Sequence, residues 1–331
     1  MDPDTTALRA ALRAGDRVAL AKAITLIEST RPADRVLAID LLDRLGPAPN
    51  MALRLGITGI PGVGKSTLID ALGRHAIAQG RRVAVLATDP SSQRSGGSIL
   101  GDKTRMDALS RAEQAFIRPS PTSGLLGGVA PRTREIMLLC EAAGYDLILV
   151  ETVGVGQSEA DVDNMTDLNV LLTIAGAGDD LQGIKRGIME SADAIVVTKT
   201  QQLDTKMLTS TLQALQHAIP FLPLRENGRR PEVLRTDALA GTGIAALWAH
   251  VLALFERDLG SGRVQARRTE QQVGWMKQAI AEGLQRLLQD TPGMGTILAD
   301  QTEEVRTGRT GALKAAEAVL QAFRKAGARL P

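Results

Sequence analysis

Short apolar runs alternate with helical patterns through the middle of the chain. The clearest runs are residues 53–58, 83–88, 147–151, 170–174 and 194–198. Most of them are unbroken rather than alternating, which is typical of strands covered on both faces of a parallel sheet. The pattern therefore predicts a doubly wound α/β domain with a mostly parallel sheet. In such a domain, ligands bind beyond the carboxyl ends of the strands.

Helical patterns precede this alternation. Over residues 1–45, apolar positions recur at helical spacing, and Gly15 followed by Asp16 predicts that one helix ends and another begins there. The sequence Gly-Pro-Ala-Pro-Asn at 46–50 is typical of a linker. We therefore expect an N-terminal helical extension over residues 1–50.

Helical patterns also follow the alternating region. One helix face is marked by Val273, Met276, Ile280, Leu284 and Leu287. Since these apolar positions have no evident core of their own, an oligomerisation arm is favoured over a simple packing layer. We expect the central α/β domain to span residues 51–257 and the helical arm to span residues 258–331.

A glycine-rich loop follows the first apolar run. Its residues are Gly59, Ile60, Pro61, Gly62, Val63, Gly64, Lys65, Ser66 and Thr67, which fit the pattern G-x-x-x-x-G-K-[ST]. A helical pattern comes next, and strand, loop and helix together favour a phosphate site over a plain glycine turn. Glycines let several backbone N–H groups point at one anion, and the helix N-terminus adds partial positive charge. We expect Lys65 to reach the outer phosphates and the Ser66 hydroxyl to bind Mg²⁺.

Acidic residues follow at other strand ends. Asp89 ends the second run, and Asp102 lies in a glycine-rich, charged segment at 96–106. With Ser66 they would supply the oxygen ligands that Mg²⁺ prefers, although a turn cap and a solvated loop would also explain them. Glu151 ends a run of four apolar residues, as in a Walker B strand with Glu in place of Asp. Both Glu151 and Gln157 are candidates for positioning an attacking water.

Composition narrows the classes of function. The chain has 331 residues, of which 44% are hydrophobic and 23% charged, as in an ordinary globular protein. The net charge of +2 and the 2% of aromatic residues give no support for binding nucleic acid. One cysteine, Cys140, excludes an intramolecular disulfide and favours a reducing cytosol. An apolar run of ~18 residues is missing, as is a basic start followed by an apolar segment, so we expect a cytoplasmic protein that neither spans a membrane nor is secreted.

Taken together, these segments resemble the methylmalonyl-CoA-mutase-associated GTPase family, known as MeaB or ArgK, of the metallochaperone-like P-loop GTPases. The resemblance covers nearly the whole chain. It rests on residues 16–29, the phosphate loop 59–67, and residues 96–106, 116–121, 151–159, 176–185 and 267–271. It implies a homodimeric GTPase that binds GTP and GDP with Mg²⁺. It also implies a chaperone of an adenosylcobalamin-dependent acyl-CoA mutase, which gates cobalamin delivery and protects or reactivates the mutase.

The resemblance also implies roles for particular residues. Lys65 contacts phosphates, while Ser66, Asp89 and Asp102 serve the Mg²⁺ site with Glu151 at the Walker B position. Lys65, Asp89 and Glu151 are accordingly the candidate catalytic residues. Residues 96–106 and 151–159 correspond to switch loops. Residues 179–186 resemble a third switch, with Gln182 and Lys185 facing the mutase and Lys185 as the charged contact.

The base-reading end departs from the family. GTPases of this kind read guanine with [NT]-K-x-D, whereas this chain has Thr-Lys-Thr-Gln at 198–201. Lys199 can still lie along the base, but Gln201 replaces the carboxylate, and a neutral amide makes at most one good acceptor contact there.

A second departure lies in the loop at 237–239. Asp237 stands where the family usually has a Ser-led loop, ahead of Ala238 and Leu239. It would repel a guanine carbonyl, accept from an exocyclic amine, or point to solvent and leave the contact to the backbone N–H of Ala238 or Leu239. We hypothesise a relaxed guanine preference, with GTP still the first choice.

Two other classes carry the same phosphate loop. Metal-insertion GTPases usually have His- or Cys-rich sites, but this chain has only His75, His217 and His250, scattered, and one cysteine. A kinase, as the ArgK label suggests, needs a substrate site, and a separate cluster for one does not stand out. Mutase-stimulated hydrolysis and transfer of labelled phosphate to an acceptor other than water would separate these readings.

Overall fold

The structure is a computed structural model of the chain, and it describes residues 3–89, 106–121, 132–152, 162–175 and 186–327. The chain divides into two compact units, Met1–Arg268 and Thr269–Pro331. The first unit contains the sheet and the N-terminal helices, and the second contains most of the C-terminal helices.

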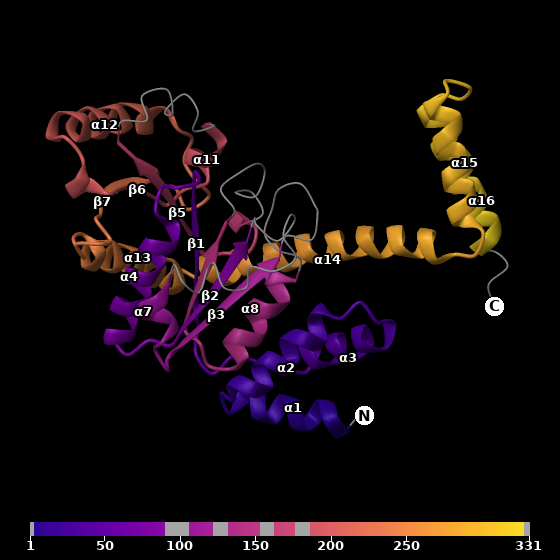
Figure 1. Ribbon diagram of the computed structural model, residues 1–331, viewed down its shortest axis with the longest axis horizontal. Coiled ribbons are helices and arrows are strands. Elements are labelled where there is room, and N and C mark those ends of the chain that lie inside the picture. The colour runs from indigo at the N-terminus through magenta and orange to yellow at the C-terminus, as the bar shows by residue number, and fades with distance from the viewer. Residues whose placement is uncertain (1–2, 90–105, 122–131, 153–161, 176–185, 328–331) are drawn as a thin grey trace. The chain divides into compact units, whose positions relative to one another are not determined.

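One parallel sheet forms the centre of the first unit (Figure 1). Within the described residues its strands are β1 (Leu53–Gly59), β2 (Val83–Asp89), β3 (Ala115–Pro121), β4 (Leu147–Glu151), β5 (Leu168–Ile174), β6 (Ala194–Thr198) and β7 (Glu232–Arg235). They pair in the order β3-β2-β4-β1-β5-β6-β7, and every pair is parallel. This confirms the predicted parallel α/β fold and its five expected strands.

Two strands, β3 and β7, were not expected from the hydrophobic pattern. Both lie at the edges of the sheet. An edge strand needs only one hydrogen-bonded neighbour, so β3 accommodates Pro119 and Pro121, which a central strand would exclude. The residues of β7 are exposed or half-buried, and so they lack the continuous apolar run that marks the central strands.

Helices cover both faces of the sheet. One face packs on α4 (Lys65–Ala78), α7 (Asp107–Ser110) and α13 (Ile244–Gly260), and the other on α8 (Thr133–Ala142), α11 (Arg186–Glu190) and α12 (Thr205–Ala218). Successive strand residues therefore serve different cores: Leu149 of β4 packs with the first set, and Val150 with α8. This double burial explains the unbroken apolar runs of the central strands.

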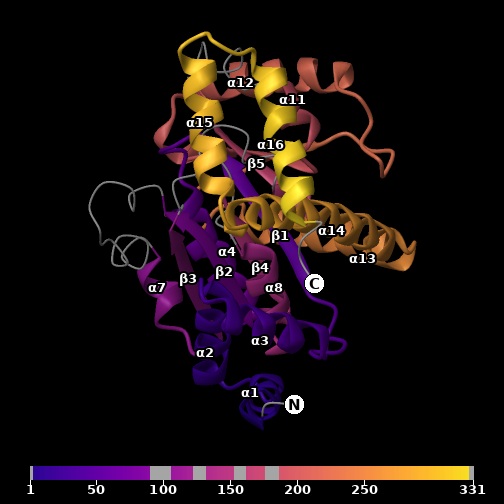
Figure 2. The ribbon, with the colours of Figure 1, turned by 90° about the vertical axis from the view of Figure 1, so that its right-hand side faces the viewer.

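The N-terminal extension forms three helices, α1 (Pro3–Arg13), α2 (Arg17–Glu28) and α3 (Pro32–Asp43). They lie together on the α8 side of the sheet, as Figures 1 and 2 both show. The expected break at Gly15 and Asp16 is confirmed: Gly15 has φ 81°, and the Asp16 carboxylate caps α2 by accepting from Val18 N at 2.7 Å and Ala19 N at 3.3 Å.

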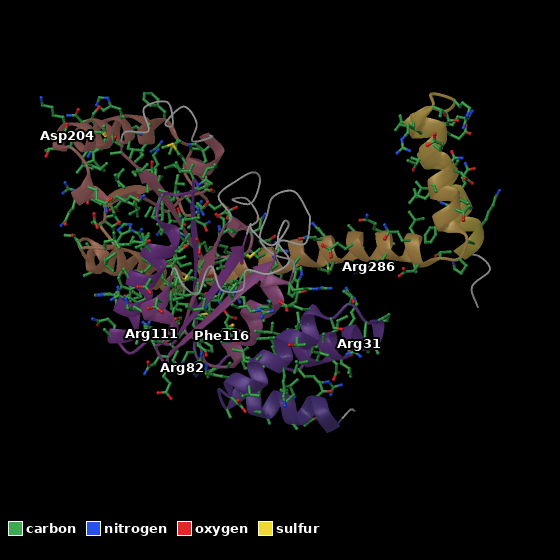
Figure 3. All side chains as sticks on the ribbon, in the orientation of Figure 1. Arg31, Arg82, Arg111, Phe116, Asp204 and Arg286 are labelled. Carbon is green, nitrogen blue, oxygen red and sulfur yellow. The ribbon has the colours of Figure 1, made fainter. Side chains whose placement is uncertain are left out.

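The few aromatic residues include one cluster beneath these helices. The Tyr145 ring is fully buried. Its centroid lies 5.9 Å from that of Phe116 and 4.7 Å from the Arg82 guanidinium, and Figure 3 labels these two neighbours. Cys140 lies in the same core, and burial followed by the neighbouring Glu141 charge raises the pKa of its thiol. A thiol held protonated is a poor nucleophile, so Cys140 serves as a core residue.

Three helices make up the C-terminal region: α14 (Arg263–Asp290), α15 (Met294–Arg306) and α16 (Ala312–Gly327). α14 begins in the first unit and continues into the second, where α15 and α16 pack on each other. Between these helices, α14 ends at Asp290 and Gly293, at φ 82°, precedes α15. Across the described residues, none of the helices combines the length and apolar character needed to cross a membrane.

Candidate functional site

The predicted chemistry gathers at the carboxyl edge of the sheet. Glu151, the last residue of β4, lies in register with Ile57 of β1 on one side and Ala87 of β2 on the other. Gly59 and Asp89 each follow two residues beyond those positions, at the same edge. The backbone register therefore brings the phosphate loop, Asp89 and Glu151 together, as expected for parallel strands.

The phosphate loop joins β1 to α4 through left-handed glycines. Gly59, Gly62 and Gly64 have φ of 144°, 80° and 102°, conformations that a side chain rarely adopts. A Cβ on Gly59 would lie 2.6 Å from Leu172 O, so only glycine fits there without displacing β5. Among the other residues of the loop, Val63 is buried, Ser66 and Thr67 are half-buried, and Ile60 and Pro61 are exposed.

Lys65 folds its side chain back over this loop. Its Nζ donates to Gly59 O at 2.7 Å and to Ile60 O at 3.2 Å, and the residue is buried at the first position of α4. A charged phosphate oxygen accepts a stronger hydrogen bond than a carbonyl. The ammonium therefore already lies where it would meet phosphates cradled by the loop.

Ser66 and Glu151 meet beside the loop. Ser66 Oγ donates to Glu151 Oε1 at 3.1 Å, and Glu151 is buried at the end of β4. A hydroxyl and a carboxylate are hard oxygen donors of the kind that Mg²⁺ takes, together with water and phosphate oxygens. These two residues therefore fit a magnesium ion. Asp89 is placed at the same edge by its backbone, and the fourth predicted ligand, Asp102, lies outside the described residues.

Two side chains at the end of β6 donate hydrogen bonds to the phosphate loop. Thr198 Oγ1 donates to Val63 O at 2.7 Å, and Lys199 Nζ donates to Gly62 O at 2.8 Å. Lys199 adopts a left-handed backbone conformation, with φ 56°, which turns its side chain toward the loop. The structure thus brings the predicted base-reading lysine against the phosphate loop. The role of Thr198 was not foreseen from the sequence.

Gln201 and Asp237 also come together, but in an unexpected arrangement. The Asp237 carboxylate is buried within its own loop, where Oδ1 accepts from Ala240 N at 3.1 Å and Oδ2 from Gln201 N at 3.2 Å. It faces neither solvent nor an open ligand position. Ala238 is half-buried and Leu239 is exposed beside it. The sequence could not indicate this arrangement, because the Gln201 backbone donor is 36 positions away.

Asp204, three residues beyond Gln201, is the next carboxylate along the chain. Its Oδ1 accepts from Lys206 N at 3.2 Å, and the residue caps the N-terminus of α12, where Figure 3 labels it. Gln157, Gln182 and Lys185 lie outside the described residues.

A buried charge network at the opposite edge of the sheet was missed by sequence reasoning. It consists of Arg54, Glu141, Asp167 and Arg268, near the amino ends of β1 and β5. Arg54 interrupts an otherwise apolar strand, and Arg268 belongs to the arginine pair at 267–268. These charges were visible signals, but their pairing spans 101 positions and is not encoded locally.

Known proteins with similar sequences support the assignment of this chain to one family. A family model described as methylmalonyl Co-A mutase-associated GTPase MeaB matches residues 20–292. A Mycobacterium tuberculosis protein named as a probable GTPase is 50% identical over 321 residues, which cover 97% of this chain and 96% of that one. GTPase ArgK of Escherichia coli is 50% identical over 272 residues, 82% of each chain. The methylmalonic aciduria type A homolog, mitochondrial, of Mus musculus is 43% identical over 321 residues, 94% of this chain and 77% of that one.

A solved structure supports the same assignment. The crystal structure of a protein described as LAO/AO transport system kinase has a TM-score of 0.75 and 34% identity to this chain. The match covers 98% of this chain and 99% of that chain, so it includes helices that come before and after the sheet in the sequence. With the phosphate loop, the parallel sheet and these relatives in agreement, the chain belongs to the methylmalonyl Co-A mutase-associated GTPase family, MeaB.

Proposed function

We propose that this GTPase is a chaperone of an adenosylcobalamin-dependent acyl-CoA mutase, gating cofactor delivery and protecting or reactivating the mutase. The hydrolytic part is supported by one observation above all: Lys65, Ser66 and Glu151 converge at the carboxyl edge of the sheet. The mutase part is supported by the description of the family and by the name of the mouse relative. Methylmalonyl-CoA mutase is the first candidate partner, with 2-hydroxyisobutyryl-CoA and isobutyryl-CoA mutases as close alternatives.

Hydrolysis would proceed by attack of water on the γ-phosphate of GTP. The loop N–H groups and Lys65 bind and orient the phosphates, and Lys65 offsets the negative charge that develops on them. Ser66 and Glu151, with Asp89 and Asp102, would hold Mg²⁺, which when bound neutralises phosphate charge. Glu151, which ends β4 beside Ser66, is one candidate for orienting the attacking water through a carboxylate oxygen. Gln157 is the second candidate for that task.

The proposal predicts a slow intrinsic GTPase that its mutase accelerates. The chain should co-purify with one of the three mutases. The purified chain should hydrolyse GTP faster when that mutase is added. Lys185→Ala should leave the intrinsic rate within about twofold but reduce the mutase-stimulated rate about tenfold, the expected effect of one lost charged contact. Lys22→Ala, an exposed lysine on α2, is the matched control.

Two results would contradict this proposal, and a third would contradict the role given to Lys185. Absence of stimulation by every one of the three mutases would remove the chaperone role. Transfer of labelled γ-phosphate to an acceptor other than water would favour a kinase. Equal loss of the intrinsic and stimulated rates in Lys185→Ala would show that this residue does not serve signalling.

We also propose that two copies of the chain pair through α14. Its exposed apolar face carries Met276, Ile280, Leu284 and Leu287, which are 55%, 54%, 57% and 50% exposed in the single chain. The spacing of these residues places them along one stripe of the helix. An apolar stripe of this length left in water is typical of an interaction surface.

Charge on this stripe should separate the two copies. Ile280→Glu combined with Leu284→Glu is expected to convert a dimer to a monomer in size-exclusion chromatography with light scattering. The reason is that carboxylates cannot be buried unpaired at the interface. Gln285→Glu adds a charge to an exposed neighbour off the stripe and should leave the dimer intact. An unchanged mass in the double variant would refute the α14 interface.

A further inference from the structure

The base end of the proposed GTP site is built by two loops that are tied together. One follows β6 and contains Lys199 and the short helix η1 (Thr200–Gln202); the other follows β7. Thr200 N and Oγ1 both donate to Thr236 O, at 3.4 and 3.3 Å. The second loop is closed by paired backbone hydrogen bonds between Asp237 and Thr242, both 3.0 Å long. Residues 199–202 and 236–242 therefore form one unit beside the phosphate loop.

The only carboxylate among residues 199–202 and 236–242 is already used. Asp237 is 2% exposed, and each of its oxygens accepts a backbone N–H, one from Ala240 and one from Gln201. Turning it toward a ligand would break both of these partly buried hydrogen bonds, which is costly. Asp237 thus holds the two loops in place and does not supply an acceptor to the base.

Gln201 is the exposed polar side chain at the base-reading position, and hydrogen bonds hold both its side chain and its backbone. Its Nε2 donates to Thr242 Oγ1 at 2.9 Å, and its own backbone N–H is held by Asp237. With the amide nitrogen directed at Thr242, the amide oxygen is the atom that it presents as an acceptor. A carboxylate at this position would instead present two charged acceptors.

We propose that the nucleotide site recognises 6-oxopurines as a class and does not select guanine over hypoxanthine by its exocyclic amine. Guanine offers two donors on the edge concerned, N1–H and the 2-amino group, whereas hypoxanthine offers N1–H alone. One neutral acceptor at Gln201 serves N1–H in both bases. Adenine has no N1–H, so its N1 lone pair would face the amide oxygen, and it is rejected. This inference rests on the proposed GTP site and deepens it.

The charge of the acceptor sets the size of the effect. A hydrogen bond to a charged group contributes roughly 10- to 100-fold in affinity, and one between neutral groups roughly 2- to 10-fold. A paired carboxylate would therefore separate guanine from hypoxanthine strongly, through the second hydrogen bond. The single amide oxygen of Gln201 leaves the 2-amino group without that charged partner.

Binding of diphosphates to the full chain tests this inference. Isothermal titration calorimetry with GDP, IDP and ADP, each with Mg²⁺, should give Kd values for GDP and IDP within about tenfold of each other, with ADP the weakest. A GDP preference over IDP greater than about tenfold, or ADP binding as tightly as IDP, overturns the inference and leaves the GTP site standing. Binding of none of the three overturns the proposed function as well.

Variants assign the selectivity to Gln201. Gln201→Asp alone would place a second carboxylate beside Asp237, so it is combined with Asp237→Ser, whose hydroxyl can still accept one backbone N–H. The double variant should widen the GDP-to-IDP ratio at least about tenfold, by adding a charged second acceptor. Gln213→Asp adds a carboxylate at an exposed residue of α12, outside these two loops, and should leave the ratio unchanged.

Other outcomes decide against the inference. A double variant that binds GDP with an unchanged ratio shows that Gln201 does not read the purine edge. If the double variant fails to bind GDP, the Kd values of GDP and IDP are measured for Gln201→Ala instead. It should weaken GDP and IDP by the same factor, and a selective loss of GDP would show that the amide does contact the 2-amino group.

Discussion

Replacing Lys65 by alanine is expected to lower GTP turnover by about a thousandfold while the fold remains. The Lys65 Nζ lies against two carbonyl oxygens of the phosphate loop, within a buried position at the start of α4. Removing one preorganised donor that stabilises transition-state charge typically costs about 10²- to 10³-fold in kcat. Here the donor also carries a full positive charge, so the upper end of that range applies.

Two controls separate this chemical effect from unfolding. Lys206→Ala removes an exposed lysine near the start of α12 and should leave turnover unchanged. Lys65→Met keeps most of the aliphatic side chain, so it should retain the melting temperature and still lose turnover. The measurement is single-turnover hydrolysis at saturating GTP, with circular dichroism on each variant. Normal turnover in Lys65→Ala would refute the assignment of the phosphate loop.

Local patterns in the sequence predicted the parts of this fold that depend on near neighbours. Strands β4 and β6 were predicted with the bounds that the structure has, because every residue in them is buried and apolar runs mark such strands. The cap at Asp16 was equally predictable, because its acceptor serves amides two and three residues away. The phosphate loop belongs with them, since its glycines and Lys65 interact within a few positions.

Features that depend on distant partners were not predictable. Asp237 was considered as a residue facing the base or solvent, but its partner is the backbone of Gln201 on another loop. The edge strands β3 and β7 lacked a signal because only one side of each is paired. The charged residues at the amino edge of the sheet were visible individually. Their mutual neutralisation, however, appears only when β1, α8 and α14 meet.

That neutralisation involves two arginines and two acids. Arg268 makes a bidentate contact with Asp167, at 2.8 Å from Nε and 2.7 Å from Nη2, and Arg54 makes another with Glu141, at 2.7 and 2.8 Å. The Asp167 carboxylate also accepts from Arg54 N at 2.8 Å. Burial by itself lowers the pKa of Arg268, but the hydrogen bonds and charge of Asp167 outweigh it and raise that pKa. Two arginines and two carboxylates therefore balance one another in formal charge.

Because the cluster is balanced, removing one charge should be more damaging than removing a pair. Arg268→Met is expected to destabilise the first unit by about 3–5 kcal/mol, since it leaves an excess negative charge inside the protein. Arg268→Met combined with Asp167→Asn restores neutrality and keeps an acceptor for Arg54 N. It should therefore cost less than the single variant, a departure from additivity.

Urea unfolding followed through Trp248 measures this effect. Trp248 is buried in the first unit, and a Trp275→Phe background removes the other of the two tryptophans, so the signal reports that unit alone. Arg111→Met is the matched control in the same unit. That arginine is labelled in Figure 3, and its side chain is 76% exposed and pairs with Asp107 at 2.5 Å. An exposed pair of this kind contributes less than about 1 kcal/mol. Equal destabilisation by Arg268→Met and Arg111→Met, or a double variant that loses the sum of its parts, would show that the buried cluster does not act as a unit.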